Sequence, residues 1–122
     1  MFLDHLSIRV SDAQRSRAFY TAVLAPLGIE LVAELNGWHG FGRDDVPAFW
    51  FCAAEQPQRP LHIAFAAPSR AAVDAFHAAA LAVGARDNGA PGVRTAYHPV
   101  DYRAYVFDPD GHNIEAVCHD MA

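Results

Sequence analysis

Hydrophobic and polar positions follow the same pattern twice along the chain. Residues 3–10 alternate between the two kinds and favour β-branched and apolar side chains, which predicts a strand. Residues 61–67 show the same alternation. After each stretch, apolar side chains recur at the spacing of one helix face. Each half of the chain is therefore predicted to begin with a strand followed by a helix.

The two predicted helices have recognisable ends. Ser11 begins an S-x-x-Q pattern with Gln14, which predicts a capping box, and Pro26 with Gly28 ends the first helix. Ser69 is predicted to cap the second helix. The expected buried positions are Ser16, Phe19, Tyr20, Val23, Leu24 and Leu27 in the first helix, and Val73, Phe76, Ala80 and Leu81 in the second.

Short strands follow in both halves. We expect them at residues 29–34, 38–42 and 48–53, and at residues 102–107 and 113–118. Asn36 and Gly37 predict a hairpin turn, as do residues 108–111. The Gly- and Pro-rich residues 87–99 are expected to form a connection. The prediction is an α+β domain of two βαβββ modules, which form a cupped mixed sheet with the helices on its outer face.

The two halves are also similar residue by residue. Aligning His5 with His62 requires a shift of 57 residues, and the same shift matches Phe19 with Phe76. Such internal similarity indicates a duplicated unit. We therefore expect one domain over residues 1–122, with module one at about 1–54 and module two at about 61–119.

Strand alternation places chemically active side chains on a common face. His5 shares a face with Ser7 and Arg9, His62 lies opposite the apolar face of its strand, and Glu115 lies opposite Ile114. In a cupped sheet the two imidazoles and the carboxylate converge, which is a 2-His-1-carboxylate set suited to a divalent metal.

A simpler interpretation of Glu115 also exists. A buried carboxylate needs a partner, because burying an unpaired charge is costly. An arginine such as Arg9 or Arg103 supplies that partner as well as a metal does.

Charge and composition exclude some classes of function. The net charge is −5 and all nine basic residues are arginines, which argues against nucleic acid or an anionic membrane as a partner. Without lysine there is no Schiff base. Cys52 and Cys118 do not have the spacing of a CxxC motif or a zinc ribbon, and they are expected to be reduced, buried thiols. With no signal-peptide pattern and no membrane-spanning stretch, we expect a cytoplasmic protein.

The chain resembles the vicinal oxygen chelate superfamily of glyoxalases, bleomycin-resistance proteins, fosfomycin-resistance thiol transferases and extradiol dioxygenases. The matching segments are DHLSIRVSD, RAFYTAVLAPLG, LHIAFAA and VFDPDGHNIEAV, and the similarity covers essentially the whole chain. The resemblance implies two βαβββ modules around a divalent metal, held here by His5, His62 and Glu115. Iron, manganese, nickel, zinc and cobalt are the candidate ions.

One departure affects the metal site. Glyoxalases of the family use a fourth ligand, a glutamate near the end of module one, and aligning the two modules places Trp50 at that point. An indole is not a ligand, so the resemblance implies three ligands, as in the dioxygenases and the fosfomycin-resistance enzymes. The latter also need cationic residues, whereas this chain has no lysine and lacks the arginine that they carry further downstream.

Further polar and aromatic residues are expected around the metal. Aromatic rings with polar tips suit a planar or partly apolar small molecule. The predicted substrate-binding residues are Ser7, Arg9, Trp50, Tyr97, Arg103 and Tyr105, and the predicted acid–base residues are His98 and Tyr102. The remaining histidines, His39, His77, His112 and His119, are expected at the surface or in turns, although His77 aligns with Tyr20 of the first helix, which indicates packing.

The predicted function is that of a divalent-metal-dependent enzyme that chelates vicinal oxygens of a small metabolite, with lyase, isomerase or dioxygenase chemistry. The alternative is a non-enzymatic, drug-binding protein of the bleomycin-resistance kind. Members of the family commonly form dimers, some by exchanging modules, so we expect a homodimer. In that case His5 of one chain meets His62 and Glu115 either of its own chain or of another.

Overall fold

The computed structural model describes residues 3–94 and 100–120. The elements of the first half are β1 (Leu6–Val10), α1 (Ala13–Leu24), the 3-10 helix η1 (Ala25–Leu27), β2 (Glu30–Leu35), β3 (Trp38–Arg43) and β4 (Val46–Ala53). Those of the second half are β5 (His62–Ala66), α2 (Arg70–Ala82), β6 (Asp87–Val93), β7 (Tyr102–Phe107) and β8 (Asn113–Cys118). No helix in the described ranges is long and apolar enough to span a membrane.

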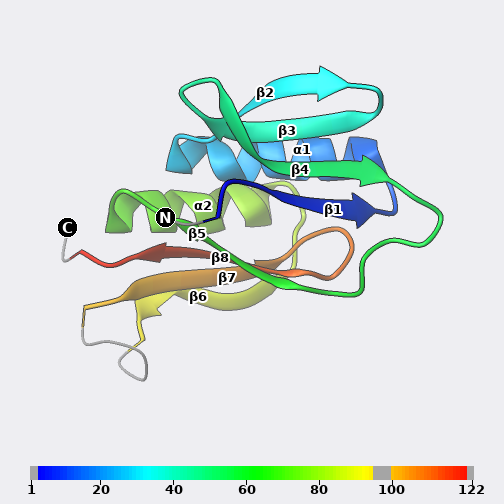
Figure 1. Ribbon diagram of the computed structural model, residues 1–122. Helices are drawn as coiled ribbons and strands as arrows, with labels where there is room; N and C mark the ends of the chain where they lie inside the picture. Colours follow the sequence, from blue (N-terminus) through cyan, green and yellow to red (C-terminus); the bar gives the residue numbers. More distant parts are fainter. Residues whose placement is uncertain (1–2, 95–99, 121–122) are drawn as a thin grey trace.

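The strands form two four-stranded mixed sheets. Their orders are β1-β4-β3-β2 and β5-β8-β7-β6, so each sheet belongs to one half of the chain. In each sheet the first and last strands of the half are parallel neighbours, and the other pairs are antiparallel. We call β1–β4 with α1 module one, and β5–β8 with α2 module two. This confirms the predicted α+β fold of two βαβββ modules (Figure 1).

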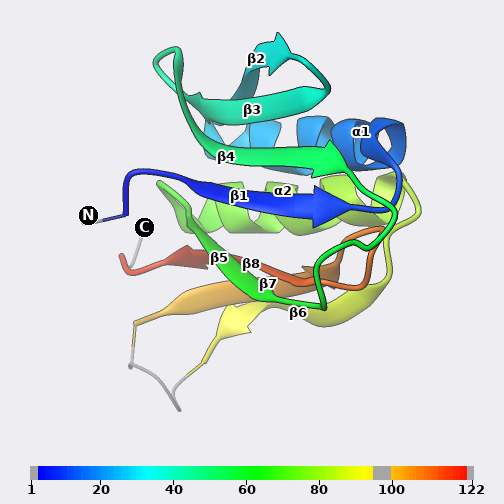
Figure 2. The same cartoon turned by 45° about the vertical axis from the view of Figure 1, so that its right-hand side comes forward.

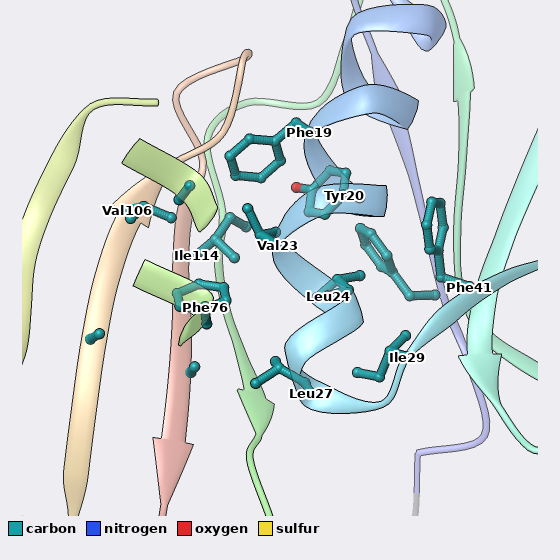
Figure 3. Close-up of a cluster of buried hydrophobic side chains, with 14 of the residues drawn as sticks. Phe19, Tyr20, Val23, Leu24, Leu27, Ile29, Phe41, Phe76, Val106 and Ile114 are labelled. Atoms are coloured by element: carbon teal, nitrogen blue, oxygen red, sulfur yellow. The ribbon is translucent and has the colours of Figure 1, made fainter. Parts of the chain in front are cut away.

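Both helices lie on the same side of the two sheets and pack against each other (Figures 1 and 2). The hydrophobic core fills the space between helices and sheets, where Phe19 and Val23 of α1 lie near Phe76 of α2 (Figure 3). Val106 and Ile114 complete this core from β7 and β8. Because one core spans both modules, burial of apolar surface joins the two halves of the chain.

The first helix begins one residue later than predicted. Asp12, rather than Ser11, is the N-cap, and its carboxylate accepts hydrogen bonds from the backbone N–H groups of Gln14 and Arg15. Aspartate caps a helix as well as serine does, so the pattern alone did not decide between adjacent candidates. At the other end, Gly28 adopts φ 77° after the 3-10 turn, a left-handed conformation that favours glycine.

The second helix confirms its predicted cap but shifts its buried face. The Ser69 hydroxyl accepts a hydrogen bond from the N–H of Ala72, as expected of an N-cap. Leu81 was predicted to be buried and is 45% exposed, whereas His77 is buried. The helix therefore turns a slightly different face to the core, and the imidazole is accommodated because it lies 2.8 Å from Asp87.

One predicted connection is a strand. Residues 87–93 were expected to be irregular because of their Gly and Pro content, yet they form β6. Its pairing with β7 is interrupted by register shifts on both sides of Gly89, which has φ 155°. Bulged edge strands tolerate the glycine and proline that a central strand excludes. By contrast, the predicted Asn36–Gly37 hairpin turn is confirmed, with φ values of 51° and 84°.

The expected surface position was wrong for His39, whereas the packing expected of His77 is confirmed, and His112 is buried beside the 108–111 turn. His39, His77 and His112 are 5%, 8% and 0% exposed. His39 stacks on Phe51 with ring centroids 5.3 Å apart, and His112 Nδ1 accepts a hydrogen bond from the N–H of Leu61. Each imidazole thus has a packing or hydrogen-bonding role within the fold.

Polar contacts also cross between the modules. The Tyr20 hydroxyl donates to Asp108 Oδ2 at 2.5 Å, and the N–H of Ser11 donates to the Asp110 carboxylate at 3.2 Å. Arg43 of module one likewise donates to the Ala66 carbonyl of module two at 2.8 Å. Burial and the nearby Asp108 carboxylate raise the pKa of Tyr20, and burial raises the pKa of Asp108.

Candidate functional site

Each sheet has one face turned away from the helices. In β1, Ile8 and Val10 are buried beneath the helices, while Ser7 and Arg9 are exposed on the opposite side. We call this opposite side the open face of each sheet. The predicted site residues at positions 7 and 9 therefore lie on the open face of module one.

Strand register shows which residues correspond on the two open faces. Ser7 of β1 pairs with Trp50 of β4, and Ala64 of β5 pairs with Glu115 of β8. Positions 7 and 64 differ by the same 57 residues that relate His5 to His62. Trp50 and Glu115 therefore occupy equivalent positions, which confirms the alignment made from the sequence.

The next strands extend the correspondence. Trp50 pairs with Gly40 in β3, and Glu115 pairs with Tyr105 in β7. Two residues before these partners, side chains return to the same face. The counterparts are thus Trp38 and Trp50 in module one, and Arg103 and Glu115 in module two.

Glu115 is the centre of the module two face. Its side chain is completely buried and has a partner on each oxygen. His62 Nε2 lies 2.7 Å from Oε1, and Arg103 Nη1 donates to Oε2 at 2.6 Å. Of the two partners considered for this carboxylate, the structure shows the arginine, Arg103, and His62 contacts the other oxygen.

The contacts continue beyond Arg103. Its Nη2 donates to Asp101 Oδ2 at 2.6 Å, and His119 Nδ1 lies 2.8 Å from the other Asp101 oxygen. The hydrogen bonds from His119 and Arg103 lower the pKa of Asp101. Partial burial alone would lower the pKa of Arg103, but its bonds to Asp101 and Glu115 outweigh this and raise it. Arg103 therefore stays cationic and fixes the orientation of the Glu115 carboxylate.

Tyr105 and Arg94 lie beside His62. The His62 and Tyr105 ring centroids are 6.2 Å apart, and Arg94 Cζ lies 5.6 Å from the Tyr105 centroid. Arg94 is oriented by donating to the Ala90 carbonyl at 2.6 Å. The His62 side chain itself is 55% exposed, so a ligand can reach it.

His5 lies apart from this cluster. It is 57% exposed, its Nδ1 is 2.7 Å from the Asp4 carboxylate, and it lines a cavity with Trp38 and Trp50. Within residues 3–94 and 100–120, no three His, Cys, Asp or Glu side chains gather closely enough to hold a metal ion. The structure thus brings together His62 and Glu115 of the predicted set, and His5 of the same chain does not join them.

Tyr102, one of the two predicted acid–base residues, lies apart from the cluster around Glu115. The Tyr102 hydroxyl donates to Asp74 of α2 at 2.6 Å, so this side chain lies on the helix side of the sheet. The hydrogen bond to Asp74 raises the pKa of Tyr102. His98, like the predicted substrate-binding Tyr97, lies outside the described residues.

Two members of the polar network were not predicted. Asp101 stands two residues before Arg103, so strand alternation was a signal that both face the same way. His119 was expected at the surface and its side chain is 68% exposed, but its contact with Asp101 depends on the bend after β8 and left no pattern in the sequence.

The donor set of module two fits part of a metal site. His62 Nε2 and Glu115 Oε1 point to one place, where an ion would replace the shared proton. Because Arg103 occupies Oε2, the carboxylate is restricted to a single coordinating oxygen. Imidazole and carboxylate are ligands for the transition metals, and the arginine is a typical outer partner of a ligating carboxylate.

Comparison with known proteins assigns the chain to a family. The family model described as "Glyoxalase/Bleomycin resistance protein/Dioxygenase superfamily" matches residues 2–116. The chain belongs to this superfamily. Members of the superfamily typically use divalent metals, and it contains dioxygenases and fosfomycin-resistance enzymes. A search of curated proteins found no match.

Solved structures of the superfamily show the same fold. A glyoxalase/bleomycin resistance protein from Albidiferax ferrireducens T118 is 32% identical with a TM-score of 0.83, covering 93% of this chain and 96% of its own. The oxidase ChaP-H2 is 19% identical with a TM-score of 0.71, covering 97% and 93%. The fosfomycin resistance protein FosX from Mesorhizobium loti is 19% identical with a TM-score of 0.68, covering 93% and 88%. The last two similarities concern the fold alone.

Proposed function

We propose that the protein is a divalent-metal-dependent enzyme that acts on a small oxygenated metabolite by chelating two adjacent oxygens. The observation that carries this proposal is the convergence of His62 Nε2 and Glu115 Oε1, 2.7 Å apart, at a place that a ligand can reach. A bound ion would act there as a Lewis acid that stabilises a developing oxyanion or enolate.

The residues around Glu115 prepare it for this role. A buried carboxylate needs hydrogen-bonding partners to be held in one orientation. Arg103 is such a partner, since it donates to Oε2, and Asp101 holds Arg103 in place from the other side. The carboxylate oxygen that remains for a metal ion is consequently Oε1, which faces His62.

The third ligand in this proposal is His5 of a second copy of the chain. His5 is accessible and lies on the open side of module one, while His62 and Glu115 belong to module two. In a homodimer that sets module one of each copy against module two of the other, two equivalent sites form, as a two-fold axis requires. Trp50 has no atom that could coordinate the ion, so coordination positions stay open for substrate and water.

The protein ligands alone support two reaction classes, a lyase or isomerase and a ring-opening dioxygenase. Both use an ion that binds adjacent oxygens, but only the dioxygenase needs a redox-active metal. Iron would indicate the dioxygenase. Nickel, zinc, manganese or cobalt would indicate the lyase or isomerase.

One observation favours a second candidate, a non-enzymatic binding protein. Both oxygens of Glu115 already have partners, and a carboxylate satisfied by His62 and Arg103 needs no metal. In this case the two open faces bind a small molecule without transforming it.

Metal content decides between the two candidates. Protein purified without a nickel column is analysed by elemental mass spectrometry, together with His5→Ala, His62→Ala and Glu115→Gln. His119→Ala is the matched control, since this exposed histidine belongs to the same network but is not a proposed ligand. We expect about one ion per chain in the wild type and the control and almost none in the three variants. A wild type that stays empty after incubation with iron, manganese, nickel and zinc contradicts the enzyme and favours the binding protein.

Mixing variants tests whether the site is shared between copies. His5→Ala and Glu115→Gln chains are unfolded together, refolded together and analysed for metal. A shared site predicts that each mixed dimer regains one complete set, because the intact His5 of one chain meets the intact Glu115 of the other. A site within one chain predicts no recovery. Far-ultraviolet circular dichroism confirms that each variant is folded.

A further inference from the structure

Both tryptophans of the chain lie on the open face of module one. Trp38 and Trp50 line a cavity of about 450 Å³ together with His5, Ser7, Leu35 and Pro47. A Cβ atom at Gly40 would stand 2.7 Å from the Trp50 ring, so the indole lies directly over this glycine. The absence of a side chain at position 40 thus lets the ring lie along the sheet as a flat platform.

A second cavity of about 440 Å³ adjoins the first, since Ser7 and Trp38 line both. Its other walls include Arg9 and Arg59. The segment that carries Arg59 is fixed to β1 by two hydrogen bonds. Gln58 N–H donates to the Arg9 carbonyl at 3.0 Å, and Arg9 N–H donates to the Gln58 side chain at 3.2 Å.

The guanidinium groups of Arg9 and Arg59 form no ion pair within residues 3–94 and 100–120. This is notable in a chain of net charge −5, where carboxylates are abundant. Guanidinium groups match carboxylates geometrically and bind them through paired N–H donors. Two of them beside an aromatic platform provide a site for an anionic group attached to a flat ring.

Module two does not offer this charge to a ligand. Arg103, which was predicted to bind substrate, donates to Glu115 and Asp101, and both carboxylates lie within 2.6 Å of it. A negatively charged substrate group would be repelled by these two carboxylates. The other arginine near this face, Arg94, already donates to the Ala90 carbonyl and lies over the Tyr105 ring, so the cations left for such a group are Arg9 and Arg59 of module one.

We propose that the ligand is a planar conjugated anion, with its ring on Trp38 and Trp50 and its acidic group on Arg9 and Arg59. This inference rests on the proposed function in one respect, namely that the ring lies beside His5 and so presents its oxygens to the metal. It specifies the class of substrate, which the metal ligands alone leave open.

The two tryptophans also provide the test. Because the chain has no others, its tryptophan fluorescence reports on this face alone. Metal-free protein is titrated with three probes of similar size, namely benzoate, the non-planar anion cyclohexanecarboxylate and the neutral planar benzamide. We expect benzoate to change the emission saturably and to bind about tenfold more tightly than either control, because benzamide lacks the charge and cyclohexanecarboxylate lacks the flat ring.

The variant Arg9→Gln/Arg59→Gln tests the cationic end. It is expected to bind benzoate about tenfold more weakly while its weak binding of benzamide is unchanged. Arg15→Gln/Arg86→Gln is the matched control, since it removes two arginines that line a different cavity, between α1 and the turn after β7. Trp50→Leu, measured by calorimetry, is expected to abolish the preference for benzoate over cyclohexanecarboxylate.

Several results overturn the inference. One is the absence of a saturable fluorescence change with benzoate up to about 10 mM, the weak limit of a specific small ligand. The others are equal affinity for all three probes and an equal loss of benzoate affinity in the control double variant. Metal uptake is measured on the same preparations, which separates the two proposals. Benzoate binding in a protein that takes up no metal removes the enzyme and retains the planar-anion site, while metal uptake without benzoate binding does the reverse.

Discussion

The two modules have the same framework and opposite surfaces. At equivalent positions of the open faces, module one carries Trp38 and Trp50 where module two carries Arg103 and Glu115. Beneath these positions the apolar cores correspond, as Phe19 and Phe76 show. The comparison teaches that the buried side of a duplicated unit is constrained by packing, whereas the exposed side is free to acquire different chemistry.

The strongest test of this comparison removes the charge from module two. Arg103→Leu leaves the buried Glu115 without its cation, and breaking such a pair is expected to lower the free energy of unfolding by about 3 kcal/mol. The counterpart Trp38→Leu in module one removes only a half-buried ring and should cost less. Urea unfolding followed by circular dichroism measures both.

A double variant verifies the cause. Arg103→Leu/Glu115→Leu removes both charges, so it should be more stable than Arg103→Leu alone. If the double variant is instead the less stable of the two, packing of the long side chains, rather than the unpaired carboxylate, explains the loss.

A second test concerns the bond between the modules. Tyr20→Phe keeps the aromatic ring and removes the donor to the buried Asp108. We expect a loss of about 2 kcal/mol, because a buried carboxylate oxygen loses its partner. Thermal unfolding by calorimetry should still show one transition if the shared core keeps the modules together. Two transitions would mean that the polar bond, and not the core, makes the modules unfold as one unit.

A third test is specific to the aromatic face. Gly40→Ala places a Cβ atom against the Trp50 ring, which is then expected to swing outward at a cost of about 1 kcal/mol. Tryptophan emission should shift to longer wavelength. The control, Gly92→Ala in module two, meets only the tip of Arg94 at 3.1 Å, which can move, so neither stability nor emission should change. An unchanged emission in Gly40→Ala contradicts the position assigned to the ring.

The smallest effect is expected in the pH dependence of unfolding. In the folded protein, hydrogen bonds from His119 and Arg103 lower the pKa of Asp101. This carboxyl group therefore takes up its proton at a higher pH in the unfolded protein than in the folded one. Its stabilising contribution is therefore complete above the ordinary carboxyl range, about pH 4, and is lost as the pH falls through the folded pKa. Below about pH 4, the free energy of unfolding of Asp101→Asn should therefore fall less steeply with decreasing pH than that of the wild type. The control is Glu30→Gln, an exposed carboxylate of module one, and an equal flattening there would refute the assignment.

Periodicity and alternation were sufficient to predict most of this architecture. The 57-residue repeat gave the two modules, and strand parity placed Ser7 and Arg9 on one face. The Gly- and Pro-rich β6 was missed because edge strands with bulges do not alternate regularly. The N-cap was misplaced by one residue because Ser11 and Asp12 are both good caps.

The candidate site was predictable only in part. Parity indicated that Glu115 faces the same side as His62, and an arginine was recognised as a possible partner. It did not indicate that His62 and Arg103 would contact different oxygens of the same carboxylate, since this depends on side-chain reach across neighbouring strands. Nor did parity indicate that His5 would lie apart from His62 and Glu115 of the same chain.

The contacts across the module boundary also determine which modules can pair. The N–H of Ser11 donates a hydrogen bond to Asp110, in the turn between β7 and β8 of module two. The 57-residue shift relates position 11 to Pro68, which has no N–H. Module two therefore has no N–H at this position to donate to such a turn. If two copies of module two packed together, Asp110 would lack the hydrogen bond that Ser11 gives it. A proline and a serine at matching points thus favour the pairing of module two with module one over its pairing with a second module two.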